Sequence, residues 1–221
     1  MFEQFYGLVV REVLTGWRQQ NDIIISSVFF VLAGTIFAIT TGGDHQGLAK
    51  VSGGIIWVLF VLTGFLPIDR LWKEDLEDGT LDQMLSLSVP GWQLAVAKSL
   101  RHMMIMLPTV LLAVPCAAIL LQFPLAQLGR LTLGFLVALP SFSLLTVMGA
   151  AFTLKAKGQQ LVIAIILLPL MLPVLIFGAE LSQPIFEASS SIWVNISALT
   201  ALFLFFLILC PWMTGLVLRY G

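Results

Sequence analysis

The stretch from Ile68 to Leu100 reads "IDRLWKEDLEDGTLDQMLSLSVPGWQLAVAKSL". It holds half of the twelve acidic residues of a 221-residue chain in which only 10% of residues are charged. These acids are Asp69, Glu74, Asp75, Glu77, Asp78 and Asp82. Long apolar stretches lie on both sides of this segment. The segment therefore separates two parts of the chain that are apolar enough to lie in a membrane.

The composition predicts an all-α, polytopic membrane protein. Mean hydropathy is +1.01, and 59% of the residues are hydrophobic, whereas soluble domains are roughly half apolar. A bilayer core of about 30 Å is crossed by roughly 17 to 25 apolar helical residues. We expect one membrane domain over residues 1–221 with six spans, at about Ile23–Thr40, Val51–Leu66, Met103–Leu121, Leu131–Leu154, Leu161–Ala179 and Ile192–Leu218.

The basic residues predict the orientation of these spans. Short loops rich in Lys and Arg stay on the cytoplasmic side of a membrane. With the N-terminus inside, only Lys50 and Arg130 lie outside. The other nine of the eleven Lys and Arg residues lie inside: Arg11, Arg18, Arg70, Lys73, Lys98, Arg101, Lys155, Lys157 and Arg219. We therefore expect both termini, and the segment 68–100, on the cytoplasmic side.

Residues 1–22 are predicted to form an interfacial helix that precedes the first span. Polar residues from Arg18 to Asp22 separate this helix from the span. Its large apolar residues recur at spacings of three and four, which is typical of a helix lying along a membrane surface. These residues are Phe2, Phe5, Tyr6, Val9, Val13 and Trp17.

The segment 68–100 is far longer than the usual connection of about 2 to 8 residues between bundle helices. Gly79 is expected to end one short helix, and Thr80 to cap the next, with Asp82 in its first turn. Pro90 and Gly91 predict a turn back toward the membrane. The acids would then decorate amphipathic helices at the cytosolic surface. Because an anionic leaflet repels them, a basic protein surface suits them better. The alternative is a solvated charge run that merely ends the second span.

This segment carries a family resemblance. Glu77 to Lys98 resembles the E-x-G-T-[LI]-[ED]-x-L-L…P…K pattern between the second and third spans of type-2 ABC exporter permeases. The wider stretch Gly54 to Pro90, "GIIWVLFVLTGFLPIDRLWKEDLEDGTLDQMLSLSVP", resembles the CcmB family, the membrane subunit of the haem exporter of cytochrome c maturation. The later "LVIAIILLPLMLPVLIFGA" also fits, so the resemblance covers nearly the whole chain.

The resemblance implies that the segment 68–100 is a coupling element that docks in a groove of a cytosolic ATPase. It implies a bacterial inner-membrane complex with a CcmA-type ATPase, a CcmC-type haem-handling membrane subunit and a small CcmD-type protein. The coupling residues that follow are Asp69, Arg70, Glu74, Asp75, Glu77, Asp78, Gly79, Thr80, Leu81, Asp82, Leu85, Pro90 and Lys98.

Two roles fit these expectations. The chain either exports haem or drives release of a haem-loaded chaperone for c-type cytochrome biogenesis. The alternative is a non-transporting scaffold that couples the ATPase to the haem-handling subunit. Self-pairing is expected through residues 1–22 and the first span, because a dimeric ATPase offers two grooves. Membrane lipid is the remaining expected partner, and no nucleic acid is expected.

The sequence offers little for catalysis or for tight ligand binding. It contains no Walker A pattern and no recognisable catalytic set. We therefore expect no enzyme, no metal and no cofactor on this chain, with ATP on the partner and haem as the candidate substrate. His45, in an outer loop, and His102, beside Arg101, are weak candidates for haem ligation. Solvent exposure of His45 and interfacial anchoring of His102 are the expected roles.

Other residues in the spans are expected to shape the bundle. Cys116 and Cys210 lie in apolar runs without ligand spacing, so we expect both to be buried. Several prolines should each remove a backbone hydrogen bond and favour a kink, which suits a bundle that flexes. They are Pro108 and Pro115 in the third span, Pro140 in the fourth, and Pro169 and Pro173 in the fifth.

Overall fold

The computed structural model describes residues 2–41, 45–86, 89–154, 160–182 and 192–220. Within these ranges every regular element is helical, which confirms the predicted all-α class. The first half comprises α1 (Phe2–Arg18), α2 (Gln20–Thr40), α3 (His45–Gly64), α4 (Arg70–Glu77) and α5 (Thr80–Ser86). The second half comprises α6 (Gly91–Pro108), the π-helical turn η1 (Thr109–Ala113), α7 (Val114–Leu120), the 3₁₀ turn η2 (Leu125–Gln127), α8 (Leu128–Thr153), α9 (Gln160–Leu181) and α10 (Ile192–Tyr220).

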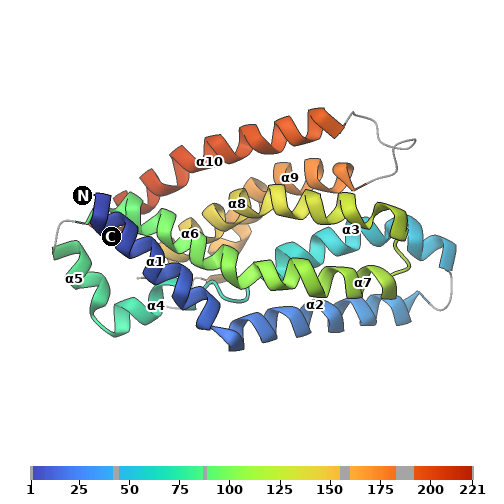
Figure 1. Ribbon diagram of the computed structural model, residues 1–221, viewed down its shortest axis with the longest axis horizontal. Coiled ribbons are helices and arrows are strands. Elements are labelled where there is room, and N and C mark those ends of the chain that lie inside the picture. Colours follow the sequence, from blue (N-terminus) through green and yellow to red (C-terminus); the bar gives the residue numbers. More distant parts are fainter. Residues whose placement is uncertain (1, 42–44, 87–88, 155–159, 183–191, 221) are drawn as a thin grey trace.

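The long helices run roughly along one direction, and both chain termini lie at the same end of the bundle (Figure 1). The short helices α4 and α5 lie at this end too, beside the start of α6 and the amphipathic helix α1. We call it the charged end, because acids and bases of α1 and α4 gather there with Lys98 and Arg101 of α6. A helix is thus present within residues 1–22, where an interfacial helix was predicted, and it ends at Arg18, four residues before the predicted boundary.

The chain is a multi-pass membrane protein. Among the described residues, five helical stretches are long and apolar enough to cross a membrane. They are Gln20–Thr40, Gly47–Gly64, Gly91–Leu120, Leu125–Thr153 and Ile192–Arg219. The third begins at Gly91, well before the predicted start at Met103, because the helix continues without a break through Lys98, Arg101 and His102. The described apolar part of α9, Leu167–Leu181, is shorter than these five.

An aromatic cluster holds α3, α8 and α9 together. The rings of Trp57 and Phe135 stack with centroids 4.1 Å apart, and Phe60 lies 4.7 Å from Phe135. Gly178 of α9 leaves room for this cluster, since a Cβ atom there would lie 2.3 Å from the Trp57 ring. The indole N–H of Trp57 donates to Ser182 Oγ at 2.8 Å. A small residue thus lets α9 approach the bundle closely, as is usual between membrane helices.

The predicted distortion of the third span appears between its two prolines. The π-helical turn Thr109–Ala113 follows Pro108 directly and precedes Pro115. Proline has no backbone N–H, so a wider turn between two prolines accommodates the missing donors. The other prolines, Pro140, Pro169 and Pro173, lie inside helices that continue past them.

The two cysteines differ in their surroundings. Cys210 is buried, as expected, whereas Cys116 is exposed, so the prediction of burial was wrong for Cys116. Cys116 lies on α7. Ile119 of the same helix is 63% exposed, and Leu112 of the preceding turn η1 is 70% exposed. This surface belongs to the candidate span Gly91–Leu120. An apolar side chain on a membrane span can face lipid, so it does not need protein around it.

Candidate coupling site

Gly79 sets the break between α4 and α5. Its φ of +71° lies in the left-handed region that glycine adopts without strain. Its N–H donates to the carbonyl of Leu76 at 3.2 Å, and its own carbonyl accepts from the N–H of Gln83 at 3.2 Å. The predicted end of the first helix is thus confirmed. The predicted cap at Thr80 is wrong, because Thr80 is already the first residue of α5 and Gly79 occupies the position before it.

One face of this helix pair packs on the bundle. Leu71 and Trp72 are each 1% exposed, and Leu81 of α5 is buried in the same cluster with Leu94 of α6. The Trp72 indole N–H donates to the carbonyl of Val147 on α8 at 3.0 Å. The amphipathic character predicted for this segment is therefore confirmed, and its apolar face fixes α4 and α5 to α6 and α8.

The same inner face buries a carboxylate. Asp75 is 4% exposed, and its Oδ1 accepts from Arg11 Nη2 of α1 at 2.7 Å, while its Oδ2 pairs with Lys98 Nζ of α6. The Lys98 ammonium also lies 5.0 Å from the centroid of the Trp72 ring. Burial alone raises the pKa of the Asp75 carboxyl, but the charges and hydrogen bonds of Lys98 and Arg11 outweigh it and hold the pKa below its usual 3.8.

Further charges extend this contact into a network. Arg101 of α6 pairs with Glu74 of α4 and lies 3.6 Å from Glu12 Oε2 of α1. Lys98 lies 3.7 Å from the same Glu12 oxygen, which has no hydrogen-bond partner. We call this group the inner ion network. It comprises three acids and three bases, whose formal charges cancel: Glu12, Glu74, Asp75, Arg11, Lys98 and Arg101.

The inner ion network joins α1, α4 and α6. Gln19, between α1 and α2, strengthens it: Arg101 Nε donates to Gln19 Oε1 at 3.0 Å, and Gln19 Nε2 donates to Glu74 Oε2 at 3.1 Å. A separate pair, Arg70 Nη1 with Asp22 Oδ1 at 2.6 Å, ties α4 to α2. Removing one member of a buried ion pair typically costs about 3–5 kcal/mol, because the other charge stays buried without compensation.

The opposite face of the helix pair is open. Glu77 and Asp78 at the end of α4 and Asp82 in the first turn of α5 are exposed, and we call these three the outer acidic face. Lys73 lies 3.7 Å from Glu77 in an i,i+4 pair, with both side chains about two-thirds exposed, at 65% and 66%. Such an exposed pair contributes only about 0.3–0.5 kcal/mol.

The thirteen predicted coupling residues therefore separate into two groups. Asp75, Leu81 and Lys98 are buried. The expectation that Asp75 lies on the surface was wrong, because its carboxylate pairs with Arg11 and Lys98 on the inner side of α4. The others are exposed or half-buried: Asp69, Arg70, Glu74, Glu77, Asp78, Gly79, Thr80, Asp82, Leu85 and Pro90.

Sequence reasoning missed several residues of the inner ion network. Arg11 and Arg101 were predicted only to lie on the cytoplasmic side, and no role was predicted for Glu12. A signal for the network exists in the sequence: Lys98 and Arg101 lie three residues apart, which places both on one face of α6. Two bases on one helix face, next to a segment with an excess of acids, indicate ion pairs between the two.

His102 does not anchor the chain at the membrane interface as expected. It is fully buried, with Nδ1 2.9 Å from Ser143 Oγ of α8 and Nε2 3.0 Å from the carbonyl oxygen of Gly64 of α3. The correction follows from the longer α6, which carries His102 into the bundle. Both ring nitrogens are thus engaged by the chain itself, and an axial bond to haem would require breaking one of these contacts. The side chain of His45 lies outside the described residues.

Comparison with known proteins places the chain in a family. Residues 3–221 match the sequence model described as CcmB protein. The protein named heme exporter protein B of Bradyrhizobium diazoefficiens is 29% identical over 215 residues, covering 97% of each chain. That of Pseudomonas aeruginosa is 32% identical over 204 residues, covering 91% of this chain and 92% of the relative. That of Haemophilus influenzae is 31% identical over 180 residues, or 81% of each chain. The chain described here therefore belongs to the CcmB protein family.

Proposed function

We propose that this chain is the permease subunit of an ABC transporter complex that exports haem, or frees a haem-loaded chaperone, for c-type cytochrome biogenesis. The names of its relatives support this proposal. The complex would lie in the bacterial inner membrane, with α9 as the sixth span and both termini in the cytoplasm. The distribution of Lys and Arg supports this orientation. The chain itself would bind no cofactor and catalyse no reaction.

We further propose that a CcmA-type ATPase binds ATP and docks on the outer acidic face. One observation carries this proposal: the acids Glu77, Asp78 and Asp82 are presented on a helix pair whose other face is fixed to the bundle. A solvated charge run that merely ends a span does not need such an attachment. A basic groove on the ATPase would complement these charges and give the contact its orientation.

The inner ion network would carry motion from the docking face into the membrane. When the ATPase displaces α4, Asp75 and Glu74 move with it, and their partners Lys98 and Arg101 belong to α6. The same displacement reaches α1 through Arg11. Coupling of this kind needs contiguous elements with more than one stable arrangement. Lys98 has two carboxylates within reach, Asp75 and Glu12, and so offers a choice between two pairings.

Site-specific photocrosslinking in membranes that hold the whole complex tests the docking proposal. A photoreactive residue replacing Asp82 should give an adduct with the ATPase. The same residue replacing Trp193, at the start of α10 and 79% exposed, should not. Trp193 is a suitable control because α10 begins at the opposite end of the bundle from the charged end (Figure 1). An ATPase adduct at Trp193 and none at Asp82 would contradict the proposal.

The scaffold role is the second candidate, and His102 favours it. Both ring nitrogens of this buried histidine are used within the bundle, so it offers haem no ready ligand. A CcmC-type subunit would then handle haem, with a small CcmD-type protein alongside. Crosslinking of photoactivatable haem in the assembled complex distinguishes the two roles. Adducts on the spans of this chain support export through it, whereas adducts confined to the haem-handling subunit support the scaffold.

We also propose that the permease pairs with itself through α1 and α2. The buried residues of α2 lie on one stripe at four-residue spacing, Asp22, Ser26, Phe30 and Gly34, so its other faces remain open to lipid or to a second copy. Native mass measurement of the purified complex tests this pairing. Two permeases for each pair of ATPase subunits are expected, and a single permease per pair would contradict the proposal.

A further inference from the structure

Glu12 of α1 lies near all three bases of the inner ion network, and its side chain is 2% exposed. Its Oε1 lies 3.7 Å from Arg11 Nη1. Its Oε2 lies 3.7 Å from Lys98 Nζ and 3.6 Å from Arg101 Nη1. A hydrogen bond from an ammonium or guanidinium group to a carboxylate spans about 2.7–2.9 Å. Glu12 Oε2 is therefore close to two bases and hydrogen-bonded to neither.

The acids of α4 hold the same bases at hydrogen-bond distance. Arg11 and Lys98 donate to the two carboxylate oxygens of Asp75. Arg101 donates to Glu74 Oε2 at 2.5 Å. Each base thus has a closely bound carboxylate on α4 and a second carboxylate on α1, which lies about 1 Å too far for a hydrogen bond.

Uncharged contacts fix the helix that carries Glu12 to α6. A Cβ atom on Gly16 of α1 would lie 2.8 Å from the carbonyl oxygen of Arg101, so the two backbones touch. Nearer the start of α6, the ring centroids of Phe5 and Trp92 lie 6.0 Å apart. Because these contacts do not involve α4, Glu12 would stay beside the bases of α6 when α4 moves.

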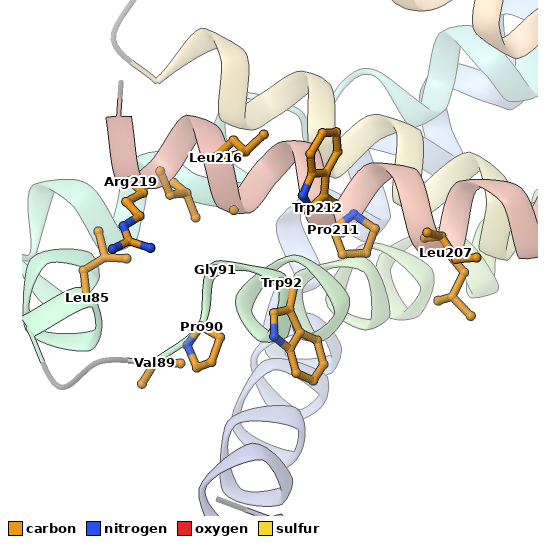
Figure 2. A pocket seen from close by; sticks show the side chains of 13 residues that line it. Leu85, Val89, Pro90, Gly91, Trp92, Leu207, Pro211, Trp212, Leu216 and Arg219 are labelled. Carbon is orange, nitrogen blue, oxygen red and sulfur yellow. The ribbon is translucent and has the colours of Figure 1, made fainter.

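The end of the helix pair α4 and α5 has space beside it. A groove of about 880 Å³ lies between Leu85, near the end of α5, and Trp212 of α10 (Figure 2). At the start of α6, by contrast, a Cβ atom on Gly91 would lie 2.6 Å from the Cα atom of Gly215. α6 is thus packed directly on α10, whereas α5 faces α10 across a groove that leaves room for movement.

We propose that Glu12 is a positioning residue that takes over Lys98 and Arg101 when α4 moves away from α6. In the described arrangement these two bases pair with Asp75 and Glu74 of α4. In a second arrangement Glu12 would accept a hydrogen bond from each of them, and the carboxylates of α4 would be released. This proposal deepens the coupling proposed above and rests on it for the role in transport. The change of partners itself is a property of this chain alone.

Glu12 lowers the free energy of the second arrangement. Lys98 and Arg101 are each 2% exposed, so moving α4 away would otherwise leave two buried bases without a carboxylate. An uncompensated buried charge is strongly destabilising. Glu12 supplies one charge for two bases, and Arg101 keeps its hydrogen bond to Gln19. The second arrangement is thus accessible but less stable than the first, so α4 returns to its resting position.

Hydrogen–deuterium exchange of the full-length chain in detergent tests the change of partners without the ATPase. The backbone amides of α4 exchange when this helix separates from the bundle. Glu12→Gln removes the second partner, whereas the resting arrangement loses no hydrogen bond at Oε2. The α4 amides should therefore exchange at least about tenfold more slowly, which is the effect of one hydrogen bond to a charged group.

A purely structural role of Glu12 predicts the opposite sign. If its charge only neutralises Lys98 and Arg101, Glu12→Gln loosens the network and α4 exchanges faster. Faster or unchanged exchange would therefore overturn the proposal. Glu3→Gln is the matched control, because it removes an exposed carboxylate from the same helix, outside the network. It should leave α4 exchange unchanged, and an equal slowing in Glu3→Gln would reduce the effect to net charge.

If Glu12→Gln fails to fold, Glu12→Asp provides the test. It keeps the charge but is one methylene shorter, so its carboxylate lies farther from Lys98 and Arg101. The α4 amides should again exchange more slowly than in the wild type. Exchange at the wild-type rate or above it in this variant would contradict the role given to Glu12.

The role in transport is tested in the assembled complex. Glu12→Gln should co-purify with the ATPase like the wild type, because Glu12 is buried and lies outside the outer acidic face. The holo-cytochrome c yield should nevertheless fall. A wild-type yield together with slower α4 exchange would refute the role in transport. Failure of the wild-type chain itself to bind the ATPase would instead refute the proposed function, and the exchange result would stand apart from it.

Discussion

The inner ion network and the outer acidic face lie within one short segment, and both contain carboxylates. Asp75 is 4% exposed and paired with Arg11 and Lys98. Glu77, two residues later, is two-thirds exposed and pairs with Lys73 one turn earlier on α4. A buried carboxylate that loses its partner costs about 3–5 kcal/mol, whereas an exposed i,i+4 pair contributes about 0.3–0.5 kcal/mol. The surroundings, rather than the residue type, therefore decide what each acid does.

The difference assigns separate roles to the two faces. The inner ion network fixes α4 to α1 and α6, so changes there should act first on folding and insertion. The outer acidic face contributes little to the fold, so changes there should act on partner binding. Substitutions on the two faces should therefore separate stability from association.

The largest effect is expected for Asp75→Ala. It leaves Lys98 buried at 2% exposure without its closest carboxylate, and the free energy of unfolding should fall by about 3–5 kcal/mol. Thermal unfolding of the purified chain in detergent, read by circular dichroism, measures the change. The double variant Asp75→Ala with Lys98→Met should recover a large part of it, because the buried charge is then gone. If Asp75→Ala were as stable as the wild type, the inner ion network would not stabilise the fold more than the outer acidic face does.

The pH dependence of this effect follows from the pKa of Asp75. Because Arg11 and Lys98 hold this pKa below 3.8, the carboxylate stabilises the fold fully above pH 3.8 and loses its effect as pH falls through the lower, folded pKa. The difference in unfolding temperature between wild type and Asp75→Asn should therefore be equal at pH 7 and pH 5 and shrink only below pH 3.8. A difference that already shrinks between pH 7 and pH 5 would mean that the pKa of Asp75 is raised.

A smaller effect is expected for Gly79→Val, which acts on the backbone between the two faces. A β-branched residue at φ +71° is strained by about 1–3 kcal/mol, and no neighbouring atom lies within 4 Å of the added Cβ, so the strain is conformational. The following helix α5, and with it Asp82, should be misaligned at every salt concentration. ATPase co-purification at low and high salt measures this effect.

Gly79→Asn is the matched control, since asparagine enters the left-handed region more readily than other non-glycine residues. It should retain most of the ATPase binding. Equal losses in the valine and asparagine variants would show that the positive φ is not what matters at Gly79.

Local features of the sequence predicted much of this structure. Six spans were predicted from the apolar lengths, and the described residues contain five helical stretches long and apolar enough to cross a membrane. The break at Gly79 followed from local turn chemistry. The burial of the Asp75 side chain could not be predicted from local features, because its partner Arg11 is 64 residues away in the chain. His102 was misplaced for the same reason: its partners Gly64 and Ser143 come from α3 and α8, and only the packing of three helices brings them together.

Docking of the ATPase on the outer acidic face is tested most directly by charge reversal. Glu77→Lys and Asp78→Lys each leave the inner ion network intact, so both variants should insert and unfold like the wild type, within about 0.5 kcal/mol. Their co-purification with the ATPase should fall, with a dependence on salt, because exposed charges are screened over about 8 Å at physiological ionic strength. Holo-cytochrome c yield should fall in parallel. Wild-type ATPase binding at low and high salt, together with a wild-type cytochrome yield, would contradict this account and reduce the outer acidic face to a solvated charge run.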